Sequence, residues 1–249
     1  GEKTTDQYYP KKYSQKGVFN DGYGQIDNWK DDNIVFEAYA TFDKTFGGKH
    51  RLTVMGGYSY ENYQSRSSML GAKGFINESL GNENLAAGDS ETYSIGNGSY
   101  KTELVSALTR INYTFDNRFL FTFTARADGS SKFGSNNKWA FFPSGAFSWK
   151  MHEERFIKDL HVFDVLKIRA SYGISGNQGI SAYQTLSRYG QHKYFSNGKW
   201  ETAIGPGYQS GTTGQSGIYA LWSGIPNKGL KWETTAQVDV CLLYTSDAA

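Results

Sequence analysis

The feature that most constrains the fold is an alternation of apolar and polar side chains, clearest in the stretch RFLFTFTARADGSSKFG at residues 118–134. Phe119 and Phe121 fall on one parity, and Thr122 and Arg126 fall on the other. Successive side chains of a β-strand point to opposite faces, so the pattern predicts a strand with one apolar and one polar face. In a soluble sandwich the apolar face meets a second sheet, whereas in an outer-membrane barrel it meets lipid and the polar face lines the lumen.

The same alternation recurs along the chain and predicts an all-β fold, an antiparallel meander of about seven strands. The 249 residues include 29 Gly, only 4 Pro and 16% aromatics, which suits many strands joined by turns. No apolar run approaches the roughly 20 residues of a membrane-spanning helix, which excludes a helical membrane protein. Pro143 predicts a bulge or break in the fifth strand, because proline cannot donate to a ladder. The expected strands are 33–43, 51–60, 103–115, 118–128, 139–149, 165–174 and 231–240.

The connections between these strands alternate between short and long without exception. The short ones are 44–50, 116–118 and 152–161, and the long ones are 64–99, 129–138 and 176–230. Alternate turns of an antiparallel meander emerge at the same end, so this order predicts short turns at one end and long loops at the other. Outer-membrane barrels have this asymmetry, with short periplasmic turns and long extracellular loops. A soluble domain with structureless links this long would be unusual.

Charged residues on the less apolar faces of the strands favour the same orientation. Against a protein core they would be costly unless paired, whereas a water-filled lumen accommodates them easily. Aromatic residues near the strand ends are candidates for the girdles at the two membrane interfaces. The charged residues are Glu37, Arg51, Arg110, Arg126, Lys167, Arg169 and Glu233, and the girdle candidates are Tyr58, Tyr60, Tyr113, Phe119, Trp139, Trp149, Tyr172 and Trp232.

Charge and cysteine content exclude other classes. The net charge is +2 and no Lys/Arg block stands out, so no nucleic-acid partner is expected. The single cysteine, Cys241, excludes a disulfide framework and a thiolate metal cluster. No charged-then-apolar segment occupies residues 1–10, so we expect no signal peptide within this stretch.

The motifs that suggest chemistry are weak. HEERF at 152–156 lacks the second His of a zinc-binding helix, and we interpret it as a periplasmic turn in which Phe156 tucks under the barrel. Asp27, Asp31 and Asp32 carry the ligand type for Ca²⁺, but their spacing matches no known calcium loop, so a solvated loop is expected. The four His lie far apart, and no Ser/His/Asp set can be nominated. We therefore expect no catalytic residue, no metal site and no cofactor, and we predict that the protein is not an enzyme.

Aromatic residues in the long loops are the candidates for substrate contact. Flat aromatic faces among Ser, Gly and Gln suit sugar rings, whose CH faces are apolar and whose rims form hydrogen bonds. The alternative is that these loops pack on one another and on a partner protein. The predicted substrate-binding residues are Tyr183, Tyr189, Tyr194, Trp200, Tyr219 and Trp222.

Five longer motifs carry a family resemblance over residues 33–240. They are FEAYATFDKTFGGKHRLTVMGGYSYE, RFLFTFTARADGSSKFG, WAFFPSGAFSWKMHEERF, LKIRASYGISGNQGISAY and GLKWETTAQVDV, in this order. The chain resembles the barrel of the SusC/RagA-type TonB-linked outer-membrane transporters of Bacteroidetes. The resemblance implies about seven strands of a roughly 22-stranded barrel, located in the outer membrane and surrounded by its lipid.

The same resemblance implies partners and cargo. An N-terminal plug would couple the barrel to the TonB complex, a SusD-like surface lipoprotein would cover it, and the cargo would be an oligosaccharide or a peptide. The signal peptide, plug, TonB-contacting box and the first and last strands of the family are not in this stretch. We therefore expect residues 1–240 to be a partial TonB-dependent receptor β-barrel domain, a fragment that cannot close.

The tail departs from the family. The segment CLLYTSDAA at 241–249 resembles the translation of a sequencing-library adapter, and we interpret it as a non-native read-through tail. The alternative is a divergent strand end.

Two rival functions remain. A soluble β-sandwich carbohydrate-binding module is disfavoured by the order of short and long links. An outer-membrane barrel enzyme is disfavoured because no catalytic set gathers on one rim.

Overall fold

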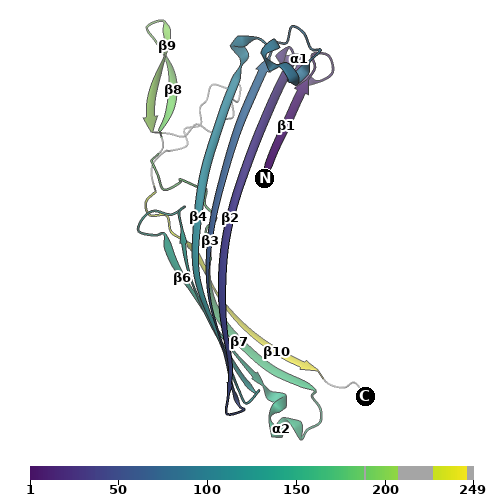
Figure 1. Cartoon of the computed structure of the whole chain (residues 1–249), viewed down its shortest axis with the longest axis vertical. Helices are drawn as coiled ribbons and strands as arrows, with labels where there is room; N and C mark the ends of the chain where they lie inside the picture. Colours follow the sequence, from purple (N-terminus) through teal and green to yellow (C-terminus); the bar gives the residue numbers. More distant parts are fainter. Residues whose placement is uncertain (188, 207–226, 246–249) are drawn as a thin grey trace. The chain divides into compact units, whose positions relative to one another are not determined.

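The computed structural model describes residues 1–187, 189–206 and 227–245 (Figure 1). Its elements are β1 (Glu2–Tyr9), α1 (Gln15–Asn20), β2 (Tyr23–Phe46), β3 (His50–Lys73), η1 (Gly81–Ala87), η2 (Ser90–Thr92), β4 (Ser94–Phe115), β5 (Phe119–Ser130), β6 (Trp139–Lys150), η3 (Met151–Glu153), α2 (Arg155–Lys158), β7 (Val165–Asn177), β8 (Tyr189–Ser196), β9 (Lys199–Pro206) and β10 (Glu233–Thr245). Within these ranges, neither α-helix has the length and apolar character needed to cross a bilayer.

The strands form one eight-stranded sheet in the order β1-β2-β3-β4-β5-β6-β7-β10, and β8 and β9 form a separate hairpin. Antiparallel ladders join β1 to β2, β4 to β5, β5 to β6, β6 to β7 and β7 to β10, which confirms the all-β meander. Contacts divide the described chain into two units, the first made of 1–34 and 62–102 and the second of the remaining residues. The strands β2, β3 and β4 contribute residues to both units.

Unit 1 is held together by a ring buried on one face of its strands. Phe75 is fully buried and meets Tyr8 edge-on, with 5.4 Å between ring centroids. Glu78, from the same loop, accepts hydrogen bonds from the Tyr8 hydroxyl at 3.2 Å and from the backbone N–H of Lys11 at 2.7 Å. Gly24 leaves room for this packing, because a Cβ there would lie 2.7 Å from Leu85. The loop between β3 and β4 is therefore folded onto the sheet.

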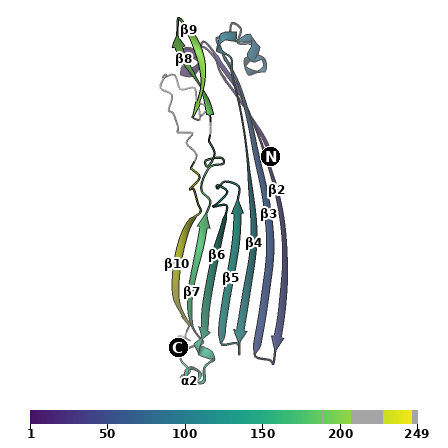
Figure 2. The ribbon, with the colours of Figure 1, turned by 90° about the vertical axis from the view of Figure 1, so that its left-hand side faces the viewer.

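Unit 2 contains the strands with the clearest two-faced pattern, and β5, β6, β7 and β10 lie side by side in Figure 2. The registers place apolar residues in rows across the strands on one face. Phe121 and Phe123 in two of these rows are each 46% exposed, although they are large and apolar. The rows are Phe115–Phe119–Trp149–Ile168–Leu242, Tyr113–Phe121–Phe147–Ala170–Val240 and Ile111–Phe123–Gly145–Tyr172–Val238.

The height of this apolar face matches a membrane. Along β5, Gly129 lies ten residues after Phe119. Phe119 stands in the row that also contains Phe115 and Trp149, and Gly129 pairs with Trp139. At about 3.3 Å per residue and a strand tilt of roughly 35–45°, that length gives an apolar band of about 25 Å, with aromatic residues at both ends. The exposed apolar face is therefore the lipid-facing side that the sequence pattern predicts.

The structure corrects the strand count and strand ends. The pattern does not predict β1, and β2, β3 and β4 are 24, 24 and 22 residues long, much longer than expected. Much of the expected long link at 64–99 is therefore strand. The part of these strands that lies in unit 1 carries polar side chains on both faces, such as Asp31 and Asp32 in β2, so it lacks the apolar period on which the prediction depends. The predicted loop around these Asp residues is strand as well.

The predicted break at Pro143 is absent, since β6 runs from Trp139 to Lys150 and pairs Pro143 with Ala125 of β5. The ladder with β7 begins only at Ser144, which pairs with Gly173. Proline therefore stands where one of the two ladders ends, a position that tolerates the missing N–H.

The predicted strict alternation of link lengths is wrong for one pair. The link 151–164 between β6 and β7 is longer than the link 131–138 between β5 and β6, because it contains η3 and α2. In this link Phe156 is 58% exposed, so it does not tuck inward as expected. Ile157 is the buried residue of α2.

Hydrogen bonds tie this link to the neighbouring turn. Glu154 accepts from Arg118 at 2.9 Å and from the Trp149 indole N–H at 3.2 Å. Glu153 pairs with Lys158 at 2.7 Å, and the hydrogen bond from that ammonium group is the main reason that the pKa of Glu153 lies below its usual value.

A change in the buried ring of unit 1 should loosen the β3–β4 loop. Phe75→Ala removes a fully buried side chain and should weaken local stability by about 3–5 kcal/mol. Limited proteolysis of the intact receptor that contains this chain should then cut the loop faster. Ile76→Ala is the matched control, because Ile76 is 95% exposed. Equal cleavage of both variants would contradict this packing.

Acid should loosen the link after β6. A carboxyl whose folded pKa lies below the unfolded value of 4.5 contributes stability above that pH and loses it as the pH falls through the folded value. Hydrogen-exchange protection of residues 151–164 in the intact receptor should therefore fall as the pH drops below about 4.5. Glu153→Gln should remove this step, and an identical pH profile in the variant would refute the assignment.

Candidate substrate pocket on the polar face of unit 2

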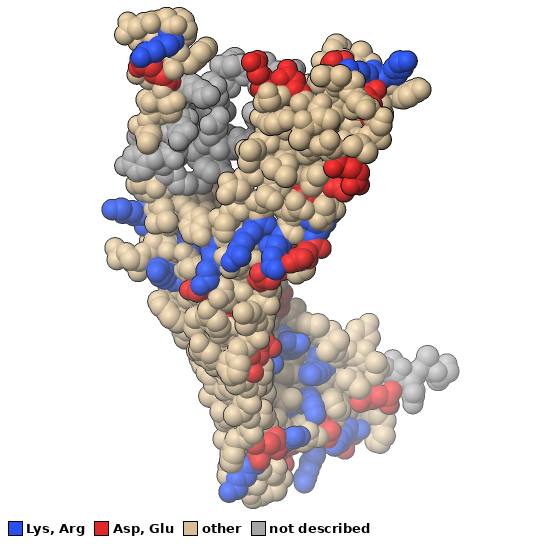
Figure 3. Space-filling view, turned by 45° about the horizontal axis from the view of Figure 1, so that its top comes forward, with Lys and Arg blue, Asp and Glu red and all other residues tan. Residues whose placement is uncertain are grey.

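The face of unit 2 opposite the apolar rows is polar across its strands. One row joins Arg110, Thr124, Ser144, Gly173 and Gln237, and the next joins Asn112, Thr122, Ala146, Ser171 and Asp239. Figure 3 shows Lys and Arg side chains gathered with Asp and Glu on part of unit 2, beside a largely uncharged surface. Water rather than lipid suits such a face.

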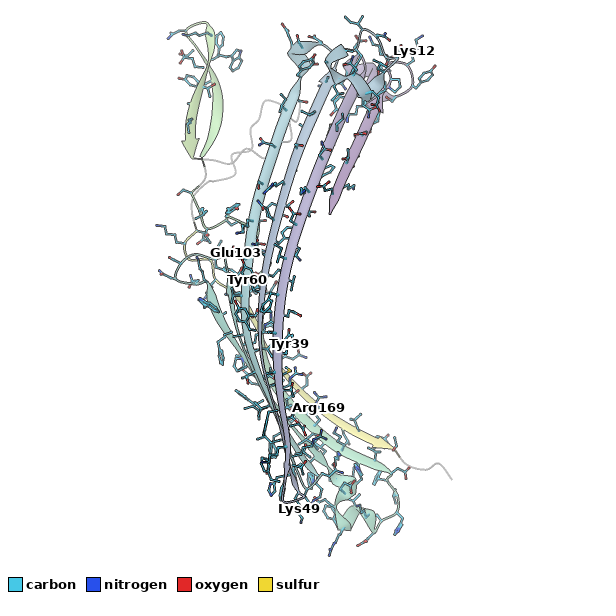
Figure 4. All side chains as sticks on the ribbon, in the orientation of Figure 1. Lys12, Tyr39, Lys49, Tyr60, Glu103 and Arg169 are labelled. Atoms are coloured by element: carbon cyan, nitrogen blue, oxygen red, sulfur yellow. The ribbon has the colours of Figure 1, made fainter. Side chains whose placement is uncertain are left out.

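Tyr58 and Tyr60 are alternate residues of β3, so their side chains point to the same face, which is the apolar face of the sheet. The Tyr60 hydroxyl lies 3.4 Å from Glu103 Oε1 of β4, and the two side chains are neighbours in Figure 4. Phe36 and Tyr58 pack beside each other on the same face, with 6.4 Å between centroids. Tyr58 and Tyr60 thus take the positions expected of girdle residues.

An aromatic cluster covers one end of the polar face. Trp232 packs on Phe133 and Phe142, with ring centroids 5.0 and 5.5 Å away, and all three are buried. The Trp232 indole N–H donates to the backbone oxygen of Lys138 at 3.0 Å. The sequence pattern places Trp232 on the same face as Ala236 and so predicts a girdle position for it. Trp232 is not a girdle residue, because β10 begins only at Glu233 and the indole ring is anchored beneath the β5–β6 loop.

A cavity of about 570 Å³ lies on the apolar face, but a second one, of about 450 Å³, lies next to the aromatic cluster and is the better candidate for a polar ligand. Its walls combine Trp232 and Phe142 with polar side chains of β5 and β7, among them Thr124, Arg126, Asp128 and Asn177. Its size and its mixture of apolar walls with a few polar groups are those of small-molecule sites.

An ion pair fixes the polar side of the pocket. The Arg126 Nε donates to both carboxylate oxygens of Asp128, at 2.7 and 2.8 Å, and an Arg126 Nη donates to the Ser106 hydroxyl at 3.1 Å. The Arg126 side chain is 45% exposed, whereas that of Asp128 is 10% exposed. The guanidinium is thus held in place by Asp128 and still faces the open side, where it can donate to a hydroxyl or a carbonyl of a ligand.

Glycine makes room for the apolar wall. A Cβ on Gly176 would lie 2.0 Å from the Phe142 ring, so that ring lies directly against the backbone of β7. The ladder between β6 and β7 ends at Ser144, next to Pro143, and beyond that point Phe142 fills the space between the two strands. The end of the ladder and the missing side chain together create the pocket wall.

The sequence-predicted loop aromatics do not form one described site. Tyr183 has a positive φ of 64° and is partly exposed. In the β8–β9 hairpin, Tyr194 pairs with Glu201 and its hydroxyl donates to Glu201 at 3.0 Å, whereas Trp200 pairs with Phe195 on the other face. Tyr189 begins β8, but its side chain lies outside the described part, as do Tyr219 and Trp222 entirely. The substrate role of these residues stays a prediction.

A strand pattern alone does not reveal the pocket residues, because it gives only the face. The pattern places Arg126 on the lumen side, but it does not indicate a pairing with Asp128 two residues along the same strand. One signal is present in the sequence: Phe141 and Phe142 are consecutive, so one of them must point to the polar face. An aromatic ring on the wet side of a strand indicates a covered or ligand-binding position.

No group of three or more His, Cys, Asp or Glu side chains with metal-site geometry occurs among the described residues. Asp27 and Asp31 share one parity of β2 and Asp32 has the other, so alternation separates the three carboxylates considered for Ca²⁺.

A two-faced antiparallel sheet with a membrane-height apolar band and a polar pocket behind it defines the wall of an outer-membrane barrel. Comparison with known proteins agrees: residues 2–248 match the family model described as TonB dependent receptor-like, beta-barrel. The chain belongs to this family.

Individual relatives and a solved structure agree with the family model. TonB-dependent receptor P3 of Formosa agariphila is 39% identical over 212 residues, which are 84% of this chain and 19% of the relative. TonB-dependent receptor SusC of Bacteroides thetaiotaomicron is 32% identical over 82% of this chain and 18% of its own length. A solved structure of the RagAB peptide transporter matches with a TM-score of 0.75 and 25% identity over 90% of this chain and 23% of that one. The chain thus spans about a fifth of the length of these curated relatives.

Adding one methyl group should disturb the pocket wall. In the intact receptor, Gly176→Ala should displace the Phe142 ring and weaken ligand binding at the pocket by about tenfold, since a misplaced wall loses its contacts. Gly145→Ala is the control, because the nearest atom to its Cβ would lie 3.9 Å away. Binding constants of the two variants, measured by titration calorimetry, check the prediction. Unchanged affinity in Gly176→Ala would contradict a role for this wall.

Proposed function

We propose that this chain forms part of the barrel wall of an outer-membrane importer that takes up an oligosaccharide or a peptide by a TonB-dependent mechanism. The observation that carries the proposal is the difference between the two faces of one sheet. One face carries exposed apolar rows whose height matches that of a membrane, and the other face carries a polar pocket. The sequence relatives are named as TonB-dependent receptors, which supports transport rather than catalysis.

The pocket suits both classes of cargo. The exposed guanidinium of Arg126, the Asn177 amide and the hydroxyl of Thr124 can form hydrogen bonds with hydroxyl groups or with peptide carbonyls. Trp232 and Phe142 supply flat apolar surface for a sugar face or a side chain. The solved relative is described as a peptide transporter, which supports a peptide cargo, whereas the mixed pocket walls leave room for a sugar.

Two partners belong to the proposal. A SusD-like surface lipoprotein would cover the extracellular opening, and the TonB complex would act through a plug that is not in this stretch. The solved relative carries the two-part name RagAB, which supports the presence of a partner protein. Affinity purification of the tagged intact receptor from its own outer membrane should recover a lipoprotein in about equal amount, and purification of the receptor alone would contradict this part.

Uptake measurements test the proposed transport. Cells that lack the gene of the intact receptor, and cells that lack TonB function, should both lose uptake of the same labelled oligosaccharide or peptide, and a plasmid copy should restore it in the first strain only. A nutrient small enough to pass through porins serves as control and should enter all strains equally. Uptake that survives loss of TonB would overturn the proposal.

A further inference from the structure

The link between β6 and β7 carries an apolar surface that neither the sheet nor the pocket explains. Phe156, Leu160 and Val162 are 58%, 57% and 53% exposed, and all three lie within residues 151–164. Figure 1 shows α2, which belongs to this link, at the end of β7. A link in contact with water alone has no use for three large apolar side chains on its surface, so the cluster indicates a binding partner.

The local fold of the link separates its apolar side from its charged side. α2 covers Arg155–Lys158, and a hydrogen bond from the Leu160 N–H to the Ile157 carbonyl extends the turn. Residues four apart on a helical turn lie on the same side, so Phe156 and Leu160 face the same way. Ile157 is buried, whereas Arg155 and Lys158 are exposed on the remaining side. The link is therefore amphipathic.

The start of the link is fixed on the lipid-facing side of the sheet. The two carboxylate oxygens of Glu154 accept hydrogen bonds from the Trp149 indole N–H at 3.2 Å and from Arg118 at 2.9 Å. Trp149 pairs with Phe119 in a row of the apolar face, and the Arg118 guanidinium lies 5.7 Å from the centre of the Phe119 ring. Trp and Phe in such a row are typical of a membrane interface. Glu154 thus holds the link at the level of this interface.

This anchoring limits how far the apolar cluster lies from the interface. The Leu166 N–H at the start of β7 donates to His152 Nδ1 at 3.3 Å, which fixes the link at a second point. The Cα of Phe156 lies within about 7 Å of the Cα of Glu154, because each residue spans at most about 3.5 Å. Apolar side chains of interfacial segments reach about 5–10 Å into the boundary between headgroups and acyl chains. Phe156 is therefore near enough to enter the boundary that Trp149 marks.

The surface continues the lipid-facing rows of the sheet. In the sheet order, β6 and β7 are flanked by β5 and β10, so both strands that the link joins already have their neighbours. The link is attached through Trp149, on the face opposite the polar pocket. Lipid is the environment that adjoins this face, which makes the bilayer the partner that the geometry favours.

The charges of the link do not provide an attraction to anionic headgroups. Lys158 pairs with Glu153 at 2.7 Å and Arg118 pairs with Glu154 at 2.9 Å. Residues 151–164 contain more acids than bases. Electrostatic attachment to anionic lipid needs a surplus of Lys and Arg near the surface. The driving force must therefore be the removal of apolar side chains from water, for which a zwitterionic lipid is sufficient.

We propose that the link 151–164 is an interfacial membrane anchor, in which Phe156, Leu160 and Val162 insert between the headgroups and the upper acyl chains of zwitterionic phospholipid. The lipid belongs to the leaflet beside the 116–118 turn, whose Arg118 holds the link. This role goes beyond the proposed import function and does not depend on the cargo. Such an anchor fixes the height of β6 and β7 in the bilayer.

The test uses the intact receptor without cysteines, reconstituted into nanodiscs of phosphatidylcholine. A bimane fluorophore is attached to single cysteines introduced as Phe156→Cys, Leu160→Cys or, as matched control, Lys158→Cys, which is exposed on the charged side of the same turn. Quenching by a lipid with a nitroxide near the top of its acyl chain should be at least about threefold stronger at 156 and 160 than at 158. Quenching by aqueous iodide should show the reverse order. Heat-dependent gel migration checks that each barrel is folded.

Three results would overturn the anchor. Iodide quenching at 156 and 160 as strong as at 158 would place the cluster in water. Protection of both positions from both quenchers would show that another part of the receptor covers them. Lipid quenching that appears only after anionic lipid is added would show that charge, rather than apolar burial, attaches the link. Strong lipid quenching at 156 and 160 in phosphatidylcholine alone, with weak quenching at 158, would support the anchor.

Discussion

Every β-strand in the membrane part of this chain must satisfy its backbone within the sheet, because lipid offers no hydrogen-bond partner. The ladders that run from β4 through β5, β6 and β7 to β10 meet this requirement. Once the backbone is paired, each residue has only two directions for its side chain, one toward hydrocarbon and one toward water. The apolar rows and the polar face with its pocket both follow from that restriction.

Glycine opposite an aromatic ring recurs at several places in this two-sided wall. A Cβ on Gly57 would lie 2.4 Å from the Tyr39 ring, and one on Gly129 would lie 2.8 Å from Trp139. The same relation joins Gly176 to Phe142 at the pocket. A ring that lies over a glycine of the next strand covers backbone that would otherwise be exposed, and it is a known way to stabilise sheets at such positions. Glycine content in this chain therefore reflects packing on strands as well as turns.

Much of the membrane part is predictable from the sequence, and much of unit 1 is not. The alternation in β5 and β7 indicates their faces correctly because lipid on one side and water on the other impose opposite chemistry on neighbouring residues. Strands with water-compatible residues on both faces, as in β1 and the first half of β2, show no such contrast, so the pattern misses their extent. The pocket depends on where β6 and β7 stop pairing and on Trp232 leaving the strand pattern, which are tertiary events. The family resemblance is confirmed, whereas the loop aromatics remain untested as substrate contacts.

Pro143 has a consequence for how the wall assembles. A strand that slips by two residues keeps every side chain on its original face, so polarity alone cannot prevent this error. Such a slip of β6 against β7 in one direction would carry the proline into the ladder, where it offers no donor and leaves a carbonyl of β7 unpaired. The proline thus opposes slippage of β6 against β7 in one of the two possible directions.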